Sequence, residues 1–331
     1  MTILRRPAVL AGAALLAVLL PAACGVPAEP APESDGGAAQ AGYPRLVERD
    51  GAEAVTIESE PRRIAALSPD AAEATLELVG PDRLVAVPRN LTSPSLGNHV
   101  EDAAAVPEQL PPGNEPDPDH VLSLEPDLIL VTPRHGGEQD ALAVLGETGV
   151  PVLALEQWDG LDDIAANLLL LGEVLDAEDR AASLVAEMAE RREAVADAVA
   201  GRDRPSVLGL SNQAGTPFVI GPDAFTSGLI ELAGGDAAAE TAGVRATGPA
   251  DPETIVAADP DAILLVDVTG GGRGSFDSVL SNPAVADLPA AAEDRVLLLP
   301  AASAFPTGVT HTLDGLEALA GWLHPEAVDH G

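Results

Sequence analysis

A fifteen-residue segment occurs twice in this chain and constrains its fold more than any other feature. Residues 117–131 (DPDHVLSLEPDLILV) align without gaps to residues 251–265 (DPETIVAADPDAILL), and six of the fifteen positions are identical. Upstream of each copy lies an apolar run that ends in a serine, Ser68 or Ser211. The same order of elements therefore occurs twice, which predicts two lobes of similar fold.

Short apolar runs alternate with amphipathic stretches around both copies. The runs have the length of buried strands, and the stretches between them have helical spacing. This βα alternation is typical of a parallel sheet that is covered by helices. The expected strands are residues 64–67, 84–87, 128–131 and 152–155 in the first half, and 206–210, 262–268 and 295–299 in the second.

One long helix is expected between the halves. No proline or glycine interrupts residues 177–200, Asp176 can cap the start, and apolar residues recur at helical spacing. Such a helix would be about 36 Å long, although it could also be a surface helix of one lobe. The predicted fold class is α/β, with two βα lobes whose parallel sheets are joined by this single helix. The expected divisions are an N-terminal lobe at 45–176, the helix at 177–200 and a C-terminal lobe at 201–331.

The first residues are typical of an export signal. Two arginines precede an apolar run at 7–20, and small residues follow before Cys24, the only cysteine. This segment resembles a bacterial lipoprotein signal, although Pro21 stands where leucine is usual. The resemblance implies a signal peptide at 1–24, a lipid on Cys24 and a protein anchored to the extracytoplasmic face of the cell membrane; an ordinary cleaved signal is the alternative. Residues 25–44, rich in Ala, Pro and Gly, are expected to form a flexible tether.

The charge of the chain argues against one class of partner. There are 53 acidic residues and 17 basic ones, all arginine, for a formal net charge of −36. Such a surface repels nucleic acid, so we expect no nucleic-acid partner. Aromatic residues make up only 2% of the chain, which leaves few rings for a stacked ligand.

Each copy of the repeat opens with the signals of a helix start. Asp117 and Asp251 suit the N-cap, and a proline follows each at the first helical position. Asp119 and Glu253 then fall in equivalent first turns, one on each lobe. An acid at that position can simply favour the helix dipole. Alternatively, the two form a matched pair of exposed carboxylates that binds a basic partner.

Several segments resemble the periplasmic binding proteins that deliver ferric siderophores, haem or cobalamin to ATP-driven importers. The resemblance covers residues 45 to 327 and is carried by 61–69 (PRRIAALSP), 77–80 (ELVG), 125–130 (EPDLIL), 231–235 (ELAGG), 259–264 (DPDAIL) and 323–326 (LHPE). It implies the class III fold of that family, in which one rigid helix joins two lobes. It also implies that Asp119 and Glu253 dock onto arginines of the two ABC permease subunits, with Asp119 one methylene shorter than the usual glutamate.

The same resemblance implies a monomeric solute-binding lipoprotein rather than an enzyme. Its expected ligand is a metal chelate, first of all a ferric siderophore, with cobalamin or haem as alternatives on the same scaffold. An exported hydrolase is the alternative of another class, but no nucleophile with a partner base is recognisable in the sequence. A sensor or adhesion protein on this scaffold is the third reading.

A ligand is expected at loops that follow the carboxyl ends of parallel strands. Arginine there can donate paired hydrogen bonds to carboxylate, hydroxamate or catecholate oxygens, and an aromatic ring can form an apolar wall. For each arginine a surface salt bridge is the alternative. The candidate ligand-binding residues on such loops are Arg89, Arg134, Trp158, Asn212, Arg273 and Phe305.

No resident metal or cofactor is expected. The six histidines are scattered without HxH or HxxxH spacing, and His135 is weighed only as a haem ligand. The glycine-rich residues 270–275 match no phosphate-binding motif and are interpreted as a mobile loop that carries Arg273.

Overall fold

The computed structural model describes residues 42–49, 54–111 and 115–326. The expected signal peptide, the lipid site at Cys24 and most of the tether lie outside these residues. Within them, no helix has both the length and the apolar character needed to cross a membrane. The described residues all belong to one compact unit, which contains two large sheets and one sheet of two strands.

The folded part begins before residue 45. The sequence assigned Tyr43 to the tether, but its side chain is only 8% exposed and its hydroxyl donates a 2.9 Å hydrogen bond to the Val174 carbonyl. The chain then forms an antiparallel pair, β1 (Arg45–Val47) with β2 (Val55–Ile57).

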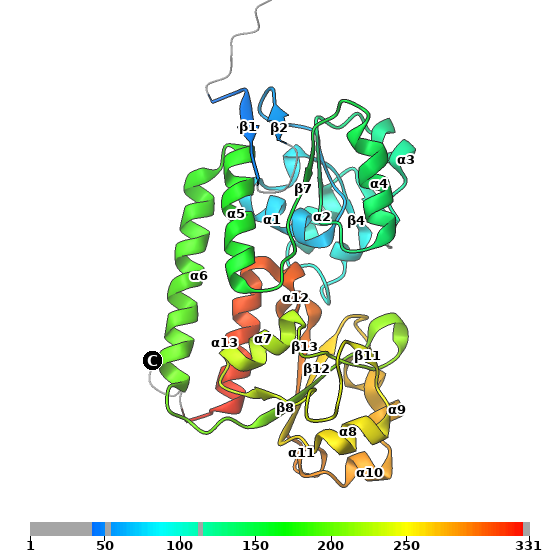
Figure 1. Ribbon diagram of the computed structural model, residues 1–331, viewed down its shortest axis with the longest axis vertical. Helices are drawn as coiled ribbons and strands as arrows, with labels where there is room; N and C mark the ends of the chain where they lie inside the picture. Colours follow the sequence, from blue (N-terminus) through cyan, green and yellow to red (C-terminus); the bar gives the residue numbers. More distant parts are fainter. Residues whose placement is uncertain (1–41, 50–53, 112–114, 327–331) are drawn as a thin grey trace, which may run out of the picture. The chain divides into compact units, whose positions relative to one another are not determined.

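The first large sheet has five parallel strands in the order β5-β4-β3-β6-β7. Its inner strands β3 and β6 are buried throughout, as apolar strands covered on both faces must be. We call residues 64–175, which hold this sheet and its helices, the N-terminal lobe (Figure 1). Its strands are β3 (Ile64–Ala66), β4 (Leu84–Pro88), β5 (Glu108–Leu110), β6 (Leu128–Val131) and β7 (Val152–Ala154). Its helices are α1 (Pro69–Val79), α2 (Val100–Ala105), α3 (Pro118–Ser123), α4 (Gly136–Gly146) and α5 (Leu161–Leu175), with 3-10 turns η1 (Pro81–Arg83) and η2 (Arg89–Thr92).

The second sheet repeats this plan with an antiparallel addition. Strands β10, β8, β12 and β13 are parallel, whereas β9 pairs antiparallel with β8, and β11 pairs antiparallel with β9. The sequence predicted only parallel strands, because two-residue strands carry no readable period. We call residues 206–323 the C-terminal lobe. Its strands are β8 (Ser206–Ser211), β9 (Phe218–Val219), β10 (Asp236–Ala237), β11 (Gly248–Pro249), β12 (Ala262–Asp267) and β13 (Val296–Pro300). Its helices are α7 (Phe225–Leu232), α8 (Pro252–Ala258), α9 (Asp277–Leu280), α10 (Pro283–Ala286), α11 (Pro289–Ala292), α12 (Ala301–Ala304) and α13 (Thr312–Leu323), with η3 (Gln213–Gly215), η4 (Gly272–Phe276) and η5 (Pro306–His311).

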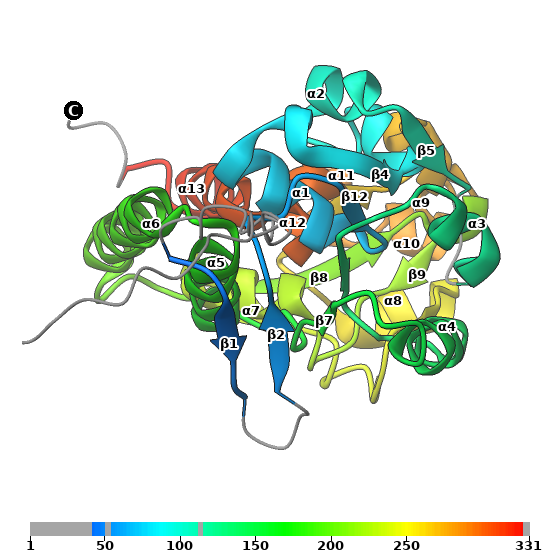
Figure 2. The same cartoon turned by 90° about the horizontal axis from the view of Figure 1, so that it is seen from above.

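A single long helix, α6 (Glu178–Val199), joins the lobes and lies beside α5 and α13 in Figure 1 and Figure 2. Its 22 residues span about 33 Å. The expected cap at Asp176 is wrong: that residue has a φ of 58° and ends α5, and Ala177 precedes α6 instead. Aspartate tolerates this left-handed conformation. A residue type that is common at helix starts therefore stands here at the end of α5. The turn is tight, because a Cβ on Gly172 would lie 2.5 Å from the Ala181 Cβ.

Hydrogen bonds also connect the lobes directly. The Asn98 amide donates to the Ala302 carbonyl over 2.9 Å, and Thr310 donates to the Glu77 carboxylate. Next to these bonds, the His99 ring lies edge-on to the His311 ring at 5.5 Å between centroids. The lobes therefore meet at a polar contact in addition to α6.

The stability of this contact should depend on pH. The His99 Nδ1 lies 2.6 Å from the Glu73 carboxylate, and this hydrogen bond raises the pKa of His99 although burial opposes it. A raised pKa means that the contribution to stability is complete below the ordinary value of 6.5 and is lost as pH rises through the folded value. The other ionisable groups near this ring are Glu77, Asp102, Arg180, Glu187, Arg191, His311 and Asp314.

We therefore expect His99→Gln to reduce the fall in unfolding free energy that the wild type shows as the pH rises above about 6.5. Urea unfolding at several pH values measures this slope. Equal slopes for the two proteins would contradict the assignment.

Candidate functional site

A cavity of about 190 Å³ lies where the two lobes face each other. Arg134 follows β6 and Trp158 follows β7 in the N-terminal lobe, while Phe305 follows β13 and α12 in the C-terminal lobe. The cavity is thus built from segments beyond the carboxyl ends of parallel strands, where α/β folds bind ligands. Three of the six predicted ligand-binding residues meet there. The other lining residues are Asp159, Gln213, Ile220, Asp223, Ala224, Phe225, Thr226, Thr247 and Pro306.

The N-terminal side of the cavity is supported by buried hydrogen bonds. Trp158 is 1% exposed, and its indole nitrogen donates to the Thr132 hydroxyl over 3.2 Å. Thr132 in turn donates to the Asp70 carboxylate over 3.1 Å, and the Arg134 guanidinium pairs with the same carboxylate. The ring and the cation are therefore both held in place before any ligand arrives, which is the condition for a preorganised site.

The C-terminal side is fixed by bonds within its own lobe. The Thr226 hydroxyl, which is buried, donates to the Ala304 carbonyl over 2.7 Å and so ties α7 to the segment before Phe305. The Thr247 hydroxyl accepts the Gly221 N–H over 3.0 Å next to Asp223. This side offers two aromatic rings, those of Phe225 and Phe305, together with hydroxyls and a carboxylate to a ligand.

The other predicted ligand-binding residues lie elsewhere. Arg89 is exposed, with a 3.4 Å contact to the Gln109 carbonyl. Arg273 forms an ion pair with Asp294, the alternative that its sequence position left open. Neither arginine lines the interlobe cavity. Their roles in binding stay predictions.

Asn212 is enclosed in the C-terminal lobe. Its amide nitrogen donates to Asp267 over 2.6 Å and to Thr269 over 2.9 Å, and its oxygen accepts the Val268 N–H over 2.6 Å. The side chain is 0% exposed and does not line the cavity, so this geometry is that of a brace for the loop after β12. Contact with a ligand also stays untested for this residue.

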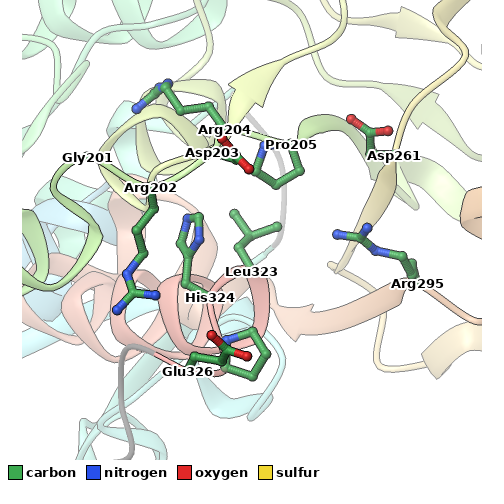
Figure 3. A pocket seen from close by; sticks show the side chains of 11 residues that line it. Gly201, Arg202, Asp203, Arg204, Pro205, Asp261, Arg295, Leu323, His324 and Glu326 are labelled. Carbon is green, nitrogen blue, oxygen red and sulfur yellow. The ribbon is translucent and has the colours of Figure 1, made fainter.

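Hollows of about 680, 580, 320 and 250 Å³ are larger than the interlobe cavity, and the first two of these lie on single lobes away from it. One of about 580 Å³ lies on the N-terminal lobe beyond β3, β4 and β5, and includes Asn90, Leu110, His120 and Glu138. The other, of about 680 Å³, lies near the amino ends of the strands of the C-terminal lobe (Figure 3). Figure 3 shows that the guanidinium groups of Arg202, Arg204 and Arg295 point in different directions, so they do not converge on one ligand. We take the interlobe cavity as the candidate site because residues of both lobes line it and three of the predicted ligand-binding residues meet there.

The two repeat acids have the geometry expected from the sequence. Asp119 on α3 and Glu253 on α8 are exposed first-turn residues, one on each lobe. The Asp117 side chain accepts the Asp119 N–H over 3.1 Å, and that of Asp251 accepts the Thr254 N–H over 2.8 Å. Hydrogen bonds from the Thr254 N–H and the Thr254 hydroxyl lower the pKa of Asp251.

The described residues contain no group of three or more His, Cys, Asp or Glu side chains that could hold a metal ion. His135, weighed as a haem ligand, is exposed and lies 3.3 Å from Glu138 rather than on the interlobe cavity. The residues that sequence reasoning missed are Asp70, Asp159 and Asp223. Asp159 directly follows the predicted Trp158, so its place on the same loop could have been predicted from the sequence. Asp70 has no local signal, because its partner Arg134 is 64 positions away.

Comparisons with known proteins agree with this architecture. A family described as "Periplasmic binding protein" matches residues 64–302. Two proteins of Halobacterium salinarum named "Cobalamin-binding protein" are 29% identical over 232 residues, which is 69% of this chain and 59% of theirs. The match thus spans less than two thirds of the length of these relatives.

Two further similar proteins are matched over a larger share of their own length. YvrC of Bacillus subtilis, named as an uncharacterized ABC transporter substrate-binding lipoprotein, is 28% identical over 77% of this chain and 79% of its own length. The periplasmic haem-binding protein RhuT from Roseiflexus sp. RS-1, solved in apo form, has 25% identity and a TM-score of 0.68 over 80% of this chain and 98% of that one.

Proposed function

Because the chain belongs to the periplasmic binding protein family, whose members act outside the cytoplasm, we propose that it captures a metal chelate between its lobes and delivers it to the permease of an ABC importer. The observation that carries this proposal is the cavity shared by both lobes, with Arg134 and Trp158 fixed on one side and Phe305 on the other. Its volume of about 190 Å³ is below the usual range for ligand pockets, so the lobes must separate to admit a chelate. The protein binds and releases its ligand without chemistry.

A ferric siderophore is the first ligand of this proposal and cobalamin the second. Arg134 can donate to the oxygens of either, and Trp158 and Phe305 can cover apolar parts. The two Halobacterium relatives specifically support cobalamin, since they are named for it. A sensor or adhesion role has no such support.

We further propose that Cys24 carries a lipid and that the lobes at 45–176 and 201–331 stand on a tether from the outer face of the cell membrane. The order of basic, apolar and small residues before Cys24 supports this anchoring, as does the lipoprotein name of YvrC. Asp119 and Glu253 would dock onto the two permease subunits, which is consistent with their exposure on separate lobes.

The test is a titration of the full chain in detergent with ferrioxamine B, ferrichrome, cyanocobalamin and haem. Trp158 lines the cavity, so binding should quench its fluorescence, and isothermal calorimetry should give the same affinity. Trp158→Phe should remove most of the signal, whereas Trp322→Phe, on α13, should preserve it. The absence of saturable binding by every chelate in both methods would refute the proposal.

A further inference from the structure

The interlobe cavity is lined by more acidic than basic side chains, although Arg134 alone would suggest a site for anions. Arg134, Asp159 and Asp223 are the charged residues among those that line it. Both aspartates are exposed, and neither forms an ion pair within the described part of the chain. One cation and two free carboxylates therefore line the same cavity.

The charge of Arg134 is neutralised by a buried carboxylate, that of Asp70. Asp70 begins α1 just after β3, is 0% exposed and pairs with the Arg134 guanidinium. Its other carboxylate oxygen accepts the Ala71 N–H over 2.8 Å and the Thr132 hydroxyl over 3.1 Å. A buried charge is retained only when it is paired and hydrogen-bonded, and these contacts supply both conditions.

The position of Arg134 is fixed at two points. Its backbone N–H donates to the buried Glu138 carboxylate over 2.7 Å, and its guanidinium is held by Asp70. The side chain stays 24% exposed and lines the cavity, and a guanidinium has five N–H donors. Arg134 can therefore donate hydrogen bonds to a ligand although its charge is already compensated.

We propose that Asp70 is a positioning residue that fixes Arg134 and cancels its charge, so that the interlobe site selects metal chelates of zero or positive net charge over anionic ones. This inference rests on the proposed function. A ferric trihydroxamate or a corrinoid offers carbonyl or amide oxygens to Arg134 without bringing net negative charge beside Asp159 and Asp223. A ferric tris-catecholate or haem brings negative charge into that field, where like charges repel.

The variant that tests the proposal is Asp70→Asn, which has nearly the same shape and frees the Arg134 charge. Affinities for ferrichrome, which is neutral, and ferric enterobactin, which is anionic, are measured by calorimetry on the full chain. We expect the ratio of the two affinities to shift about tenfold towards the anionic chelate. A purely structural role would weaken both affinities together and leave the ratio unchanged.

Two further variants keep the inference testable if Asp70→Asn folds poorly. The double variant Asp159→Asn and Asp223→Asn removes the two free carboxylates and leaves the pair of Asp70 and Arg134 intact, so the ratio should again shift about tenfold towards the anionic chelate. Asp267→Asn is the matched control, because Asp267 is a buried, hydrogen-bonded acid of the other lobe that does not line the cavity. It should lower stability and leave the ratio unchanged.

The outcomes separate this inference from the proposed function. Failure of the wild type to bind any chelate would overturn the proposed function. Binding by the wild type, together with ratios that stay within about threefold of the wild-type ratio in both Asp70→Asn and the double variant Asp159→Asn and Asp223→Asn, would overturn only this inference.

Discussion

The double variant Asp119→Arg and Glu253→Arg should abolish uptake by the ABC importer and leave the affinity for the chelate within about twofold of wild type. Both acids are exposed, lie on different lobes and do not line the interlobe cavity. In the proposed docking role, arginines in their place would face cations of the permease subunits, and such a like-charge contact costs several kcal/mol. Uptake into vesicles that contain the permease, with a parallel binding titration, measures the two effects.

A matched control exists elsewhere on the same lobes. Glu101 in α2 and Asp277 in α9 are also exposed first-turn acids, but they lie outside the repeat. Glu101→Arg with Asp277→Arg changes the net charge by the same amount and should leave uptake nearly intact. Loss of chelate binding in the repeat variant, or full uptake by it, would rule out docking as the role of Asp119 and Glu253.

The second large effect is on stability: Asn212→Ala should lower the free energy of unfolding by about 3 kcal/mol. The substitution removes the acceptor of the Val268 N–H and one of the donors to Asp267 Oδ1, which keeps its hydrogen bond from the Gly270 N–H. An unsatisfied buried group costs about 1–3 kcal/mol, and a hydrogen bond to a charged group contributes about 1.5–3 kcal/mol. Burial tends to raise the pKa of Asp267, but hydrogen bonds from Asn212 and from the backbone of 270–272 lower it overall. Guanidinium unfolding followed by circular dichroism measures the change.

The neighbouring residue provides the comparison. Gln213 is only partly buried and lines the interlobe cavity, so Gln213→Ala should change stability by less than about 1 kcal/mol. Wild-type stability in Asn212→Ala, combined with loss of chelate affinity, would show that Asn212 contacts the ligand, as the sequence analysis predicted.

The elements with strong local signals could be predicted from the sequence. Asp117 and Asp251 cap α3 and α8, each followed by proline, because a capping side chain and a fixed proline φ act within one turn. β6 and β12 are continuous apolar runs that only a strand buried on both faces accommodates. The class III fold with one connecting helix followed from these elements and from the resemblance.

The site could be predicted only in part, because a loop position does not determine where a side chain points. Arg134, Trp158 and Phe305 line one cavity, while Arg273, on an equally plausible loop, pairs with Asp294. What separates these cases is the partner brought close by the fold. The contact between Asp70 and Arg134 spans 64 positions and could be found only in the structure.

The placement of the repeat acids has one geometric consequence. Each carboxylate belongs to a different lobe, so any pivot of the lobes about their contact changes the span between Asp119 and Glu253. A pivot between the empty and the loaded protein would therefore change the distance between the two carboxylates. A permease with two fixed docking sites could therefore distinguish the loaded from the empty binding protein by this distance, without contacting the ligand.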